Sequence, residues 1–194
     1  MIYAMSDIHG CAQEFEVALA SVDLGNPENQ LILLGDYCDR GPESLRVFQM
    51  VMELQKKYPG QVISLRGNHE EMLLEYVDMV SDPDFTRAWM LADSNLATAR
   101  SFLGDQKFGR VKHLLALREF EEAYQYAVGE SFPLDVIAGH TGTATVSGIP
   151  GYKGIWYDGA SHYFIDGNVL DNGRVLVLAY DPVTGEYSGE GLER

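Results

Sequence analysis

LILLGDYCDRG at residues 31–41 passes from four apolar residues directly into a loop that carries two aspartates and an arginine. A short apolar run that ends at glycine and aspartate is typical of a buried strand followed by a turn. After this loop, from about Glu43, apolar residues recur at the spacing of one helix face, namely Leu45, Phe48, Val51 and Met52. The stretch therefore predicts a strand, a polar loop and a helix, in that order.

The same unit stands on either side of this stretch. Upstream, the apolar run Ile2–Met5 leads into SDIHG at residues 6–10 and then into a helical pattern over residues 11–22. Downstream, Val62–Leu65 leads into RGNHE at residues 66–70 and then into a helix with Met72, Leu73, Tyr76 and Val80 on one face. Three consecutive units of this kind predict a parallel α/β core whose polar loops share one edge of the sheet.

The rest of the sequence shows first a helical pattern and then a pattern of strands and turns. Residues from about 84 to 120 keep helical spacing and predict a helical insertion within a single domain that covers residues 1–194. Beyond the insertion, short apolar runs alternate with Gly, Pro, Asn and Asp, which predicts a C-terminal half of strands and turns. The expected strands are Tyr124–Val128, Val136–Ala138, Gly154–Tyr157, His162–Asp166 and Val175–Tyr180.

The three polar loops offer a ligand set for divalent metals. They hold carboxylate, imidazole and amide groups, which suit a borderline metal ion such as manganese, iron or zinc. The residues are Asp7, His9, Asp36, Asp39, Asn68 and His69. Two such ions, about 3.5 to 4 Å apart, can hold a phosphoryl group between them and make a bound water nucleophilic. The loops therefore predict a two-metal site for the hydrolysis of phosphate esters.

The charge of the chain restricts its partners. The 29 acidic and 14 basic residues give a formal net charge of -15, which argues against binding to nucleic acid or to an anionic membrane surface. An anionic phosphate ester would then depend on positive charge supplied locally, such as bound cations. No basic segment with a long apolar run opens the sequence, and no stretch stays apolar over the roughly 20 residues of a membrane span. A cytoplasmic location with reduced cysteines is the resulting expectation.

The motifs resemble those of the calcineurin-like metallophosphoesterases. That family carries Asp-x-His-Gly, Gly-Asp-x-x-Asp-Arg-Gly and Gly-Asn-His-Glu in this order, and residues 7–10, 35–41 and 67–70 match all three. The chain is also similar to the family at the Gly-His-Thr of residues 139–141 and at residues 164–167, so the resemblance spans nearly the whole chain. The chain looks most like the branch that holds the serine/threonine phosphoprotein phosphatases and the bacterial symmetrical dinucleoside tetraphosphatases. The resemblance implies a four-layer α/β sandwich with a parallel or mixed central sheet and a helical insertion.

The resemblance also implies metal ligands, residue by residue. Asp7 and His9 would hold one divalent ion, and Asp36 would bridge from it to a second. Asn68 and His140 would hold that second ion. Manganese is the expected metal at both positions, with iron or zinc as alternatives.

Three further residues are implied to carry the chemistry. His69, oriented by Asp39, would protonate the leaving alkoxide, and Arg40 would bind phosphate oxygens. An imidazole paired with a carboxylate suits a general acid near neutral pH, and the fork of an arginine suits phosphate oxygens. Arg66 is a weaker phosphate candidate that can instead pair with a carboxylate. Cys38 is interpreted as a packed side chain, because a metal-activated water leaves no need for a nucleophilic thiol.

The sequence departs from the family pattern at one metal ligand. The family has a further histidine, on a strand that ends in a Val-His-Ala-Gly-like segment well before the Gly-His-Thr, and this sequence has no match for it. The only histidine between His69 and His140 is His113, which lies in a helical pattern and is interpreted, like His162, as an ordinary residue. Two explanations stay open: a shortened member with a weakened second metal site, or a sequence that omits a loop. In the first case water, or a displaced residue such as His162, would complete the second site.

The sequence therefore predicts a metal-dependent phosphoesterase whose nucleophile is a metal-activated water. A serine/threonine protein phosphatase is the first expectation, with a phosphorylated protein or a small phosphate ester as substrate. A dinucleoside tetraphosphate hydrolase is the nearest alternative, because it shares the same core. The missing histidine motivates a third hypothesis, a catalytically weak module that binds a phosphorylated ligand.

Overall fold

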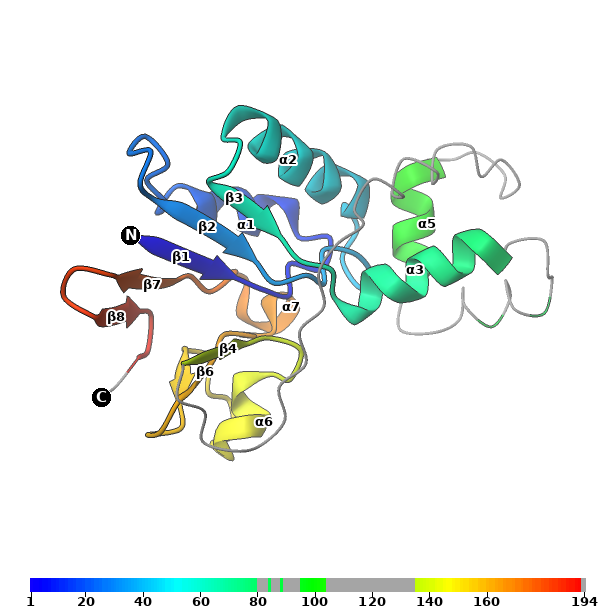
Figure 1. Cartoon of the computed structure of the whole chain (residues 1–194). Coiled ribbons are helices and arrows are strands. Elements are labelled where there is room, and N and C mark those ends of the chain that lie inside the picture. The colour runs from blue at the N-terminus through cyan, green and yellow to red at the C-terminus, as the bar shows by residue number, and fades with distance from the viewer. Residues whose placement is uncertain (80–83, 85–87, 89–94, 104–134, 193–194) are drawn as a thin grey trace.

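The computed structural model describes residues 1–79, 84, 88, 95–103 and 135–192 (Figure 1). The predicted strand Tyr124–Val128, His113 and most of the predicted helical insertion lie outside the described residues. The described residues include two sheets, and the larger one carries the three polar loops.

Three parallel strands form the core of the larger sheet. They are β1 (Ile2–Met5), β2 (Gln30–Leu33) and β3 (Val62–Ser64), in the spatial order β3-β2-β1. Two later strands, β7 (Leu178–Asp181) and β8 (Glu186–Gly189), add an antiparallel hairpin beside β1. The central sheet is therefore mixed: the predicted parallel core is present and is extended at one edge.

Each face of this sheet has its own apolar core, because successive side chains of a strand point to opposite faces. In β1, Tyr3 and Met5 belong to the core that α1 (Ala12–Leu19) and α2 (Ser44–Lys57) cover, whereas Ala4 belongs to the core on the other face. The inner face predicted for the second helix is correct at two positions and wrong at a third: Phe48 and Val51 are buried, but Met52 is 42% exposed.

A second, smaller sheet covers the opposite face of the central sheet. Its strands are β4 (Val136–Ala138), β6 (His162–Phe164) and β5 (Trp156–Tyr157), in that spatial order. Its core joins side chains from both sheets, namely Ala4, Leu178 and Tyr163. A short helix, α6 (Thr143–Ser147), lies against this sheet (Figure 1). The prediction of an α/β fold with a mixed central sheet is thus confirmed.

Two helices stand at the end of the central sheet where the polar loops lie (Figure 1). α3 (Asn68–Met79) begins directly after the loop that follows β3. α5 (Asn95–Leu103) comes from the predicted insertion and packs on α2, where the ring centroids of Phe102 and Phe48 are 6.0 Å apart. No helix within the described residues is both long and apolar enough to cross a membrane.

Three short elements of the C-terminal half escaped prediction: α6, β8 and α7 (Val169–Asn172). The two helices have only five and four residues, too few for helical spacing of apolar residues to become visible. β8 is an edge strand in which only Tyr187 is partly buried, so it carries none of the apolar alternation by which a strand is recognised.

The burial of α1 against the central sheet should account for much of the stability of the fold. Phe15→Ala removes a ring that is 0% exposed, and the loss of its contacts together with the cavity left behind should lower the free energy of unfolding by about 3–5 kcal/mol. Val17→Ala is the control, because Val17 lies on the same helix and is 67% exposed, so a change within about 0.5 kcal/mol is expected. Urea unfolding of the two variants measures the difference, and equal losses would contradict this packing.

Candidate metal centre

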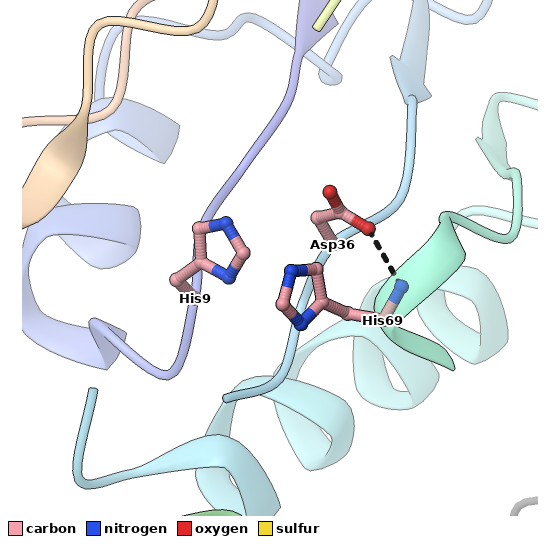
Figure 2. A group of neighbouring side chains, drawn as sticks. All are labelled: His9, Asp36 and His69. Atoms are coloured by element: carbon pink, nitrogen blue, oxygen red, sulfur yellow. Dashed lines mark hydrogen bonds between the residues drawn. The ribbon is translucent and has the colours of Figure 1, made fainter. Parts of the chain in front are cut away.

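The three polar loops meet at the carboxyl ends of β1, β2 and β3. Backbone hydrogen bonds tie the first loop to the second: the N–H groups of Asp7, His9 and Gly10 donate to the carbonyls of Gly35, Asp36 and Tyr37 over 3.3, 2.9 and 2.7 Å. The third loop leads into α3, and the N–H of His69 donates to Asp36 Oδ1 over 3.1 Å (Figure 2). Side chains that are far apart in the sequence are therefore fixed at one edge of the sheet.

Backbone strain is concentrated in these loops. Among the described residues, seven that are not glycine have positive φ, and six of them are predicted site residues: Asp7, His9, Asp36, Asp39, Arg40 and His140. A side chain in this left-handed region costs energy, and such residues persist only where the surrounding structure holds them. The loops therefore adopt a conformation that places side chains at a site at the expense of local backbone energy.

Two glycines let the loops approach one another closely. A Cβ atom at Gly67 would clash with the backbone and side chain of Asp36, and one at Gly139 would clash with Ser6 and Asp7. Only a residue without a side chain fits at either position. The third loop and the Gly-His-Thr segment can therefore lie directly against the aspartates.

Glu70 holds the second and third loops together. Its buried carboxylate accepts the backbone N–H groups of Asp36 and Tyr37 at 2.7 Å, of Gly67 at 2.9 Å and of Cys38 at 3.3 Å. The bond to Gly67 is the one that a glutamate three residues into a helix makes at the helix start. This role of Glu70 could not be predicted from the sequence, because an acidic residue in a first helical turn does not reveal that it also binds a distant loop.

His9 and Asp36 form the centre of the first predicted ligand group. His9 Nδ1 lies 2.8 Å from the carbonyl oxygen of Cys38, so Nδ1 carries the proton and Nε2 is the nitrogen that can bind a metal. His9 Nε2 is 3.8 Å from Asp7 Oδ1. One ligand atom each of His9, Asp36 and His69 lie within 4.8 Å of one another. Figure 2 shows how these three side chains lie at the ends of the loops.

Asn68 and His140 form the second predicted ligand group. His140 Nδ1 lies 2.8 Å from Asn68 Oδ1 and 4.0 Å from Asp36 Oδ2. The backbone N–H of His140 donates to Asp7, at 2.9 Å from Oδ2 and 3.1 Å from Oδ1. Asp36 therefore lies close to ligand atoms of both groups, and Asp7 fixes the backbone of His140.

His69 and Asp39 form a buried pair. His69 Nδ1 lies 2.9 Å from Asp39 Oδ2. Burial lowers the pKa of His69, but the hydrogen bond to Asp39 and the negative charge of Asp36 raise it more, so that it lies above its ordinary value of 6.5. An imidazole held in this way keeps Nε2 directed to the site and can carry a proton near neutral pH.

Arg40 lies between the two imidazoles. One nitrogen of its guanidinium is 2.8 Å from His9 Nε2 and the other is 3.4 Å from His69 Nε2. Because a guanidinium only donates hydrogen bonds, both Nε2 atoms accept. For His9 Nε2 to bind a metal ion, Arg40 has to turn away from it.

Buried carboxylates crowd this edge of the sheet. Asp7, Asp36, Asp39, Glu70 and Asp166 are each at most 5% exposed. Burial, and next the charge of Asp36, raises the pKa of Asp7 from 3.8 to about 6. Burial and next the charge of Asp7 likewise raise the pKa of Asp166 to about 6. Burial is also the first cause that raises the pKa of Asp36 and Glu70.

The raised pKa values show that the protein alone does not compensate the negative charge of these groups. Divalent cations held by carboxylate, imidazole and amide groups would compensate it, and this set of ligands suits manganese, iron or zinc. A thiolate ligand does not fit, because Cys38 Sγ lies 3.3 Å from Glu70 Oε1 and burial raises the pKa of this thiol well above its ordinary value. The residues present therefore fit two cations of the predicted kind.

The structure also places the residues that were interpreted as ordinary or weak candidates. Arg66 donates to Glu71 over 2.9 Å, which is the carboxylate pairing given as its alternative. His162 Nδ1 lies 2.8 Å from Asp158 Oδ2 at the start of β6. No role was predicted for Asp166, which stands in the motif at residues 164–167; its carboxylate lies close enough to Asp7 for the charge of Asp7 to raise its pKa.

A family model described as calcineurin-like phosphoesterase matches residues 1–188 of the chain. Among curated proteins, a symmetrical bis(5'-nucleosyl)-tetraphosphatase of Nitrosococcus oceani is 41% identical over 73 residues, which are 38% of this chain and 25% of the relative. The serine/threonine-protein phosphatase SIT4 of Candida albicans is 40% identical over 74 residues, 37% of this chain and 24% of the relative. The matched parts thus span about a quarter of the length of these relatives.

Solved structures share the fold over nearly the whole chain. One that is provisionally described as a diadenosine tetraphosphatase has a TM-score of 0.56 and 17% identity, and the match covers 100% of this chain and 94% of the other. A cold-active protein-tyrosine phosphatase of a psychrophilic Shewanella species has a TM-score of 0.53 and 14% identity, with 97% and 80% covered. At these identities the likeness establishes the architecture alone.

The raised carboxyl pKa values predict an unusual pH dependence for the metal-free protein. As the pH rises from about 4 to about 6, an unfolded chain loses protons that Asp7 and Asp166 retain in the folded chain, so the folded state loses stability, on the order of a few kcal/mol. Urea unfolding with a chelator present, between pH 4 and pH 7, measures this loss. Asp166→Asn should reduce it, and a stability that is flat or rising over this range would contradict the assignment.

Manganese should restore the stability that the folded state loses as the pH rises. Cations and protons compete for the same carboxylates, so manganese should raise the melting temperature more at pH 7 than at pH 5. Thermal unfolding at both pH values measures the shift, with potassium chloride at matched ionic strength as the control. Equal shifts at the two pH values would contradict binding at the buried carboxylates.

Proposed function

The chain belongs to the calcineurin-like phosphoesterase family, and we propose that it hydrolyses phosphate esters with two divalent cations bound between its three polar loops. The observation that carries the proposal is the position of Asp36, which lies within 4.8 Å of His9 on one side and 4.0 Å from His140 on the other. A carboxylate placed between two sets of ligands is the arrangement that a bridging ligand needs.

We propose two ligand sets, which the sequence motifs suggest and these distances support. Asp7, His9 and Asp36 would hold the first cation, and Asp36, Asn68 and His140 would hold the second. The second set lacks the further histidine of the family pattern within the described residues, so water would complete its shell. When bound, the two cations supply Lewis-acid chemistry: they lower the pKa of a bound water and offset the charge of the phosphoryl oxygens.

The protein's own side chains supply the rest of the reaction. His69, held by Asp39, would present a proton from Nε2 to the oxygen of the leaving group as the phosphorus–oxygen bond breaks. Arg40, released from His9 Nε2, would bind two phosphoryl oxygens with its fork. The positive charge that the substrate requires is thus local, which reconciles an anionic substrate with a chain of net charge -15.

For the substrate, we place dinucleoside tetraphosphates before phosphoproteins, which reverses the order expected from the sequence. Four curated relatives carry the name of symmetrical bis(5'-nucleosyl)-tetraphosphatases. A serine/threonine-protein phosphatase among the relatives supports phosphoserine or phosphothreonine as the second candidate.

Asp36→Asn tests the bridging role directly. The amide keeps the shape and can still accept the N–H of His69, but it removes the charge that two cations would share. Manganese-dependent hydrolysis of p-nitrophenyl phosphate should fall at least about 100-fold in kcat/KM, since the Lewis-acid contribution of both ions is weakened. Asp23→Asn, at an exposed loop position, is the control and should keep wild-type activity. Turnover that survives in Asp36→Asn, or a wild type without metal-stimulated turnover, would contradict the proposal.

Product analysis separates the two substrate classes. With diadenosine tetraphosphate, attack of water at an inner phosphorus should release two molecules of ADP, and the rate should exceed that for a phosphoserine peptide at equal concentration. Chromatography of the nucleotides and a phosphate-release assay measure the two reactions. Faster release of phosphate from the peptide would instead favour phosphoproteins as the substrate, as expected from the sequence.

A further inference from the structure

A hydroxyl group from α5 completes the hydrogen bonding of Asp39. Thr98 Oγ1 donates to Asp39 Oδ1 over 2.6 Å and accepts the backbone N–H of Asp39 over 2.7 Å. Both residues are 0% exposed, so water cannot replace these bonds. Asp39 Oδ2 faces Nδ1 of His69 at 2.9 Å. Each oxygen of the carboxylate thus has its own partner, and Thr98 holds the oxygen that His69 does not use.

The backbone of Asp39 also depends on this hydroxyl. Asp39 and Arg40 follow one another with φ of 67° and 66°, a conformation that persists only when its surroundings hold it. Without an acceptor, the buried N–H of Asp39 would have no hydrogen bond, which would destabilise this conformation. Thr98 therefore fixes both the carboxylate and the main chain from which it projects.

The position of α5 has a separate support. Ser101 Oγ accepts the backbone N–H of Leu45 over 3.1 Å, and Phe102 packs on Phe48. Ser44 Oγ at the start of α2 lies 3.0 Å from Thr98 Oγ1. The contacts of Ser101 and Phe102 dock the helix without touching Asp39, so the effect of the Thr98 hydroxyl can be separated from the docking of the helix.

We infer that Thr98 is a positioning residue, whose hydroxyl fixes Asp39 so that the imidazole of His69 keeps Nδ1–H on Asp39 and directs Nε2 to the leaving group. The consequence for catalysis rests on the proposed function, whereas the hydrogen bond between His69 and Asp39 is a property of the protein itself. The helix that contributes the hydroxyl lies 59 residues from Asp39 in the sequence. The orientation of His69, the proposed general acid, therefore depends on a helix from the predicted insertion.

The catalytic arm of the test uses the acidity of the leaving group. Phenolate is a poor leaving group and requires a proton, whereas p-nitrophenolate leaves without one, so only the first reaction depends strongly on His69. Thr98→Val keeps the size of the side chain and removes its hydroxyl. It should lower kcat/KM about tenfold for phenyl phosphate and less than about threefold for p-nitrophenyl phosphate.

Three comparisons separate positioning from a merely structural effect. Thr98→Ser keeps the hydroxyl and should keep the wild-type ratio of the two rates. Ser101→Ala breaks a contact of α5 with α2 and should change both rates equally, if at all. Thr98→Ala repeats the loss of the hydroxyl in case the valine variant fails to fold. Equal losses for both substrates in the variants without a hydroxyl, or a selective loss in Ser101→Ala, would overturn the inference.

The second arm needs no turnover. In the folded protein the Nδ1–H of His69 should give a far-downfield proton NMR signal, which is assigned by its disappearance in His69→Gln. This signal should survive in Thr98→Ser and Ser101→Ala and should be lost in Thr98→Val. A signal that persists in Thr98→Val would overturn the inference, even if the chain proved inactive. If the wild type is inactive but the signals follow the expected pattern, the proposed function is contradicted and the positioning role of Thr98 is not.

Discussion

Five buried carboxylates beside one another set the constraint on which the rest of this structure depends. Burial and mutual repulsion raise the pKa of Asp7 and Asp166 to about 6, so at neutral pH the folded chain holds negative charge at an energetic cost. Among the described residues, Arg40 and the imidazoles of His9, His69 and His140 interact with this charge. A pair of divalent cations would offset it far better than they do, which is why the electrostatics of the site favour metal binding.

Holding these groups in place also costs conformational energy in the backbone. Left-handed residues cost on the order of 1–3 kcal/mol each, and six of them belong to the predicted site. Glu70 compensates by accepting four backbone N–H groups of two loops. Thr98 does the same for Asp39 from α5. Ligands held in this way need little rearrangement when a cation arrives, which favours affinity and catalysis alike.

The sequence revealed the ligands but not their supports. Asp7, Asp36 and Asn68 each follow an apolar strand in a motif, and the carboxyl ends of parallel strands meet at one edge, so their convergence could be predicted. Thr98 could not be found in this way, because an isolated threonine in a helical pattern carries no signal of a partner 59 residues away. β8, which pairs with β7 in an antiparallel hairpin, was not predicted either, because an exposed edge strand has no periodic pattern of apolar residues.

Calorimetric titration of manganese into the metal-free chain at pH 7 tests the central claim most directly, because it counts ions. Two cations per chain are predicted. Asp36→Asn should reduce the stoichiometry or weaken both binding events, since both ligand sets share this residue. Binding of one ion or none to the wild type, or two ions bound equally well by Asp36→Asn, would contradict a bridged pair at the ends of the three strands.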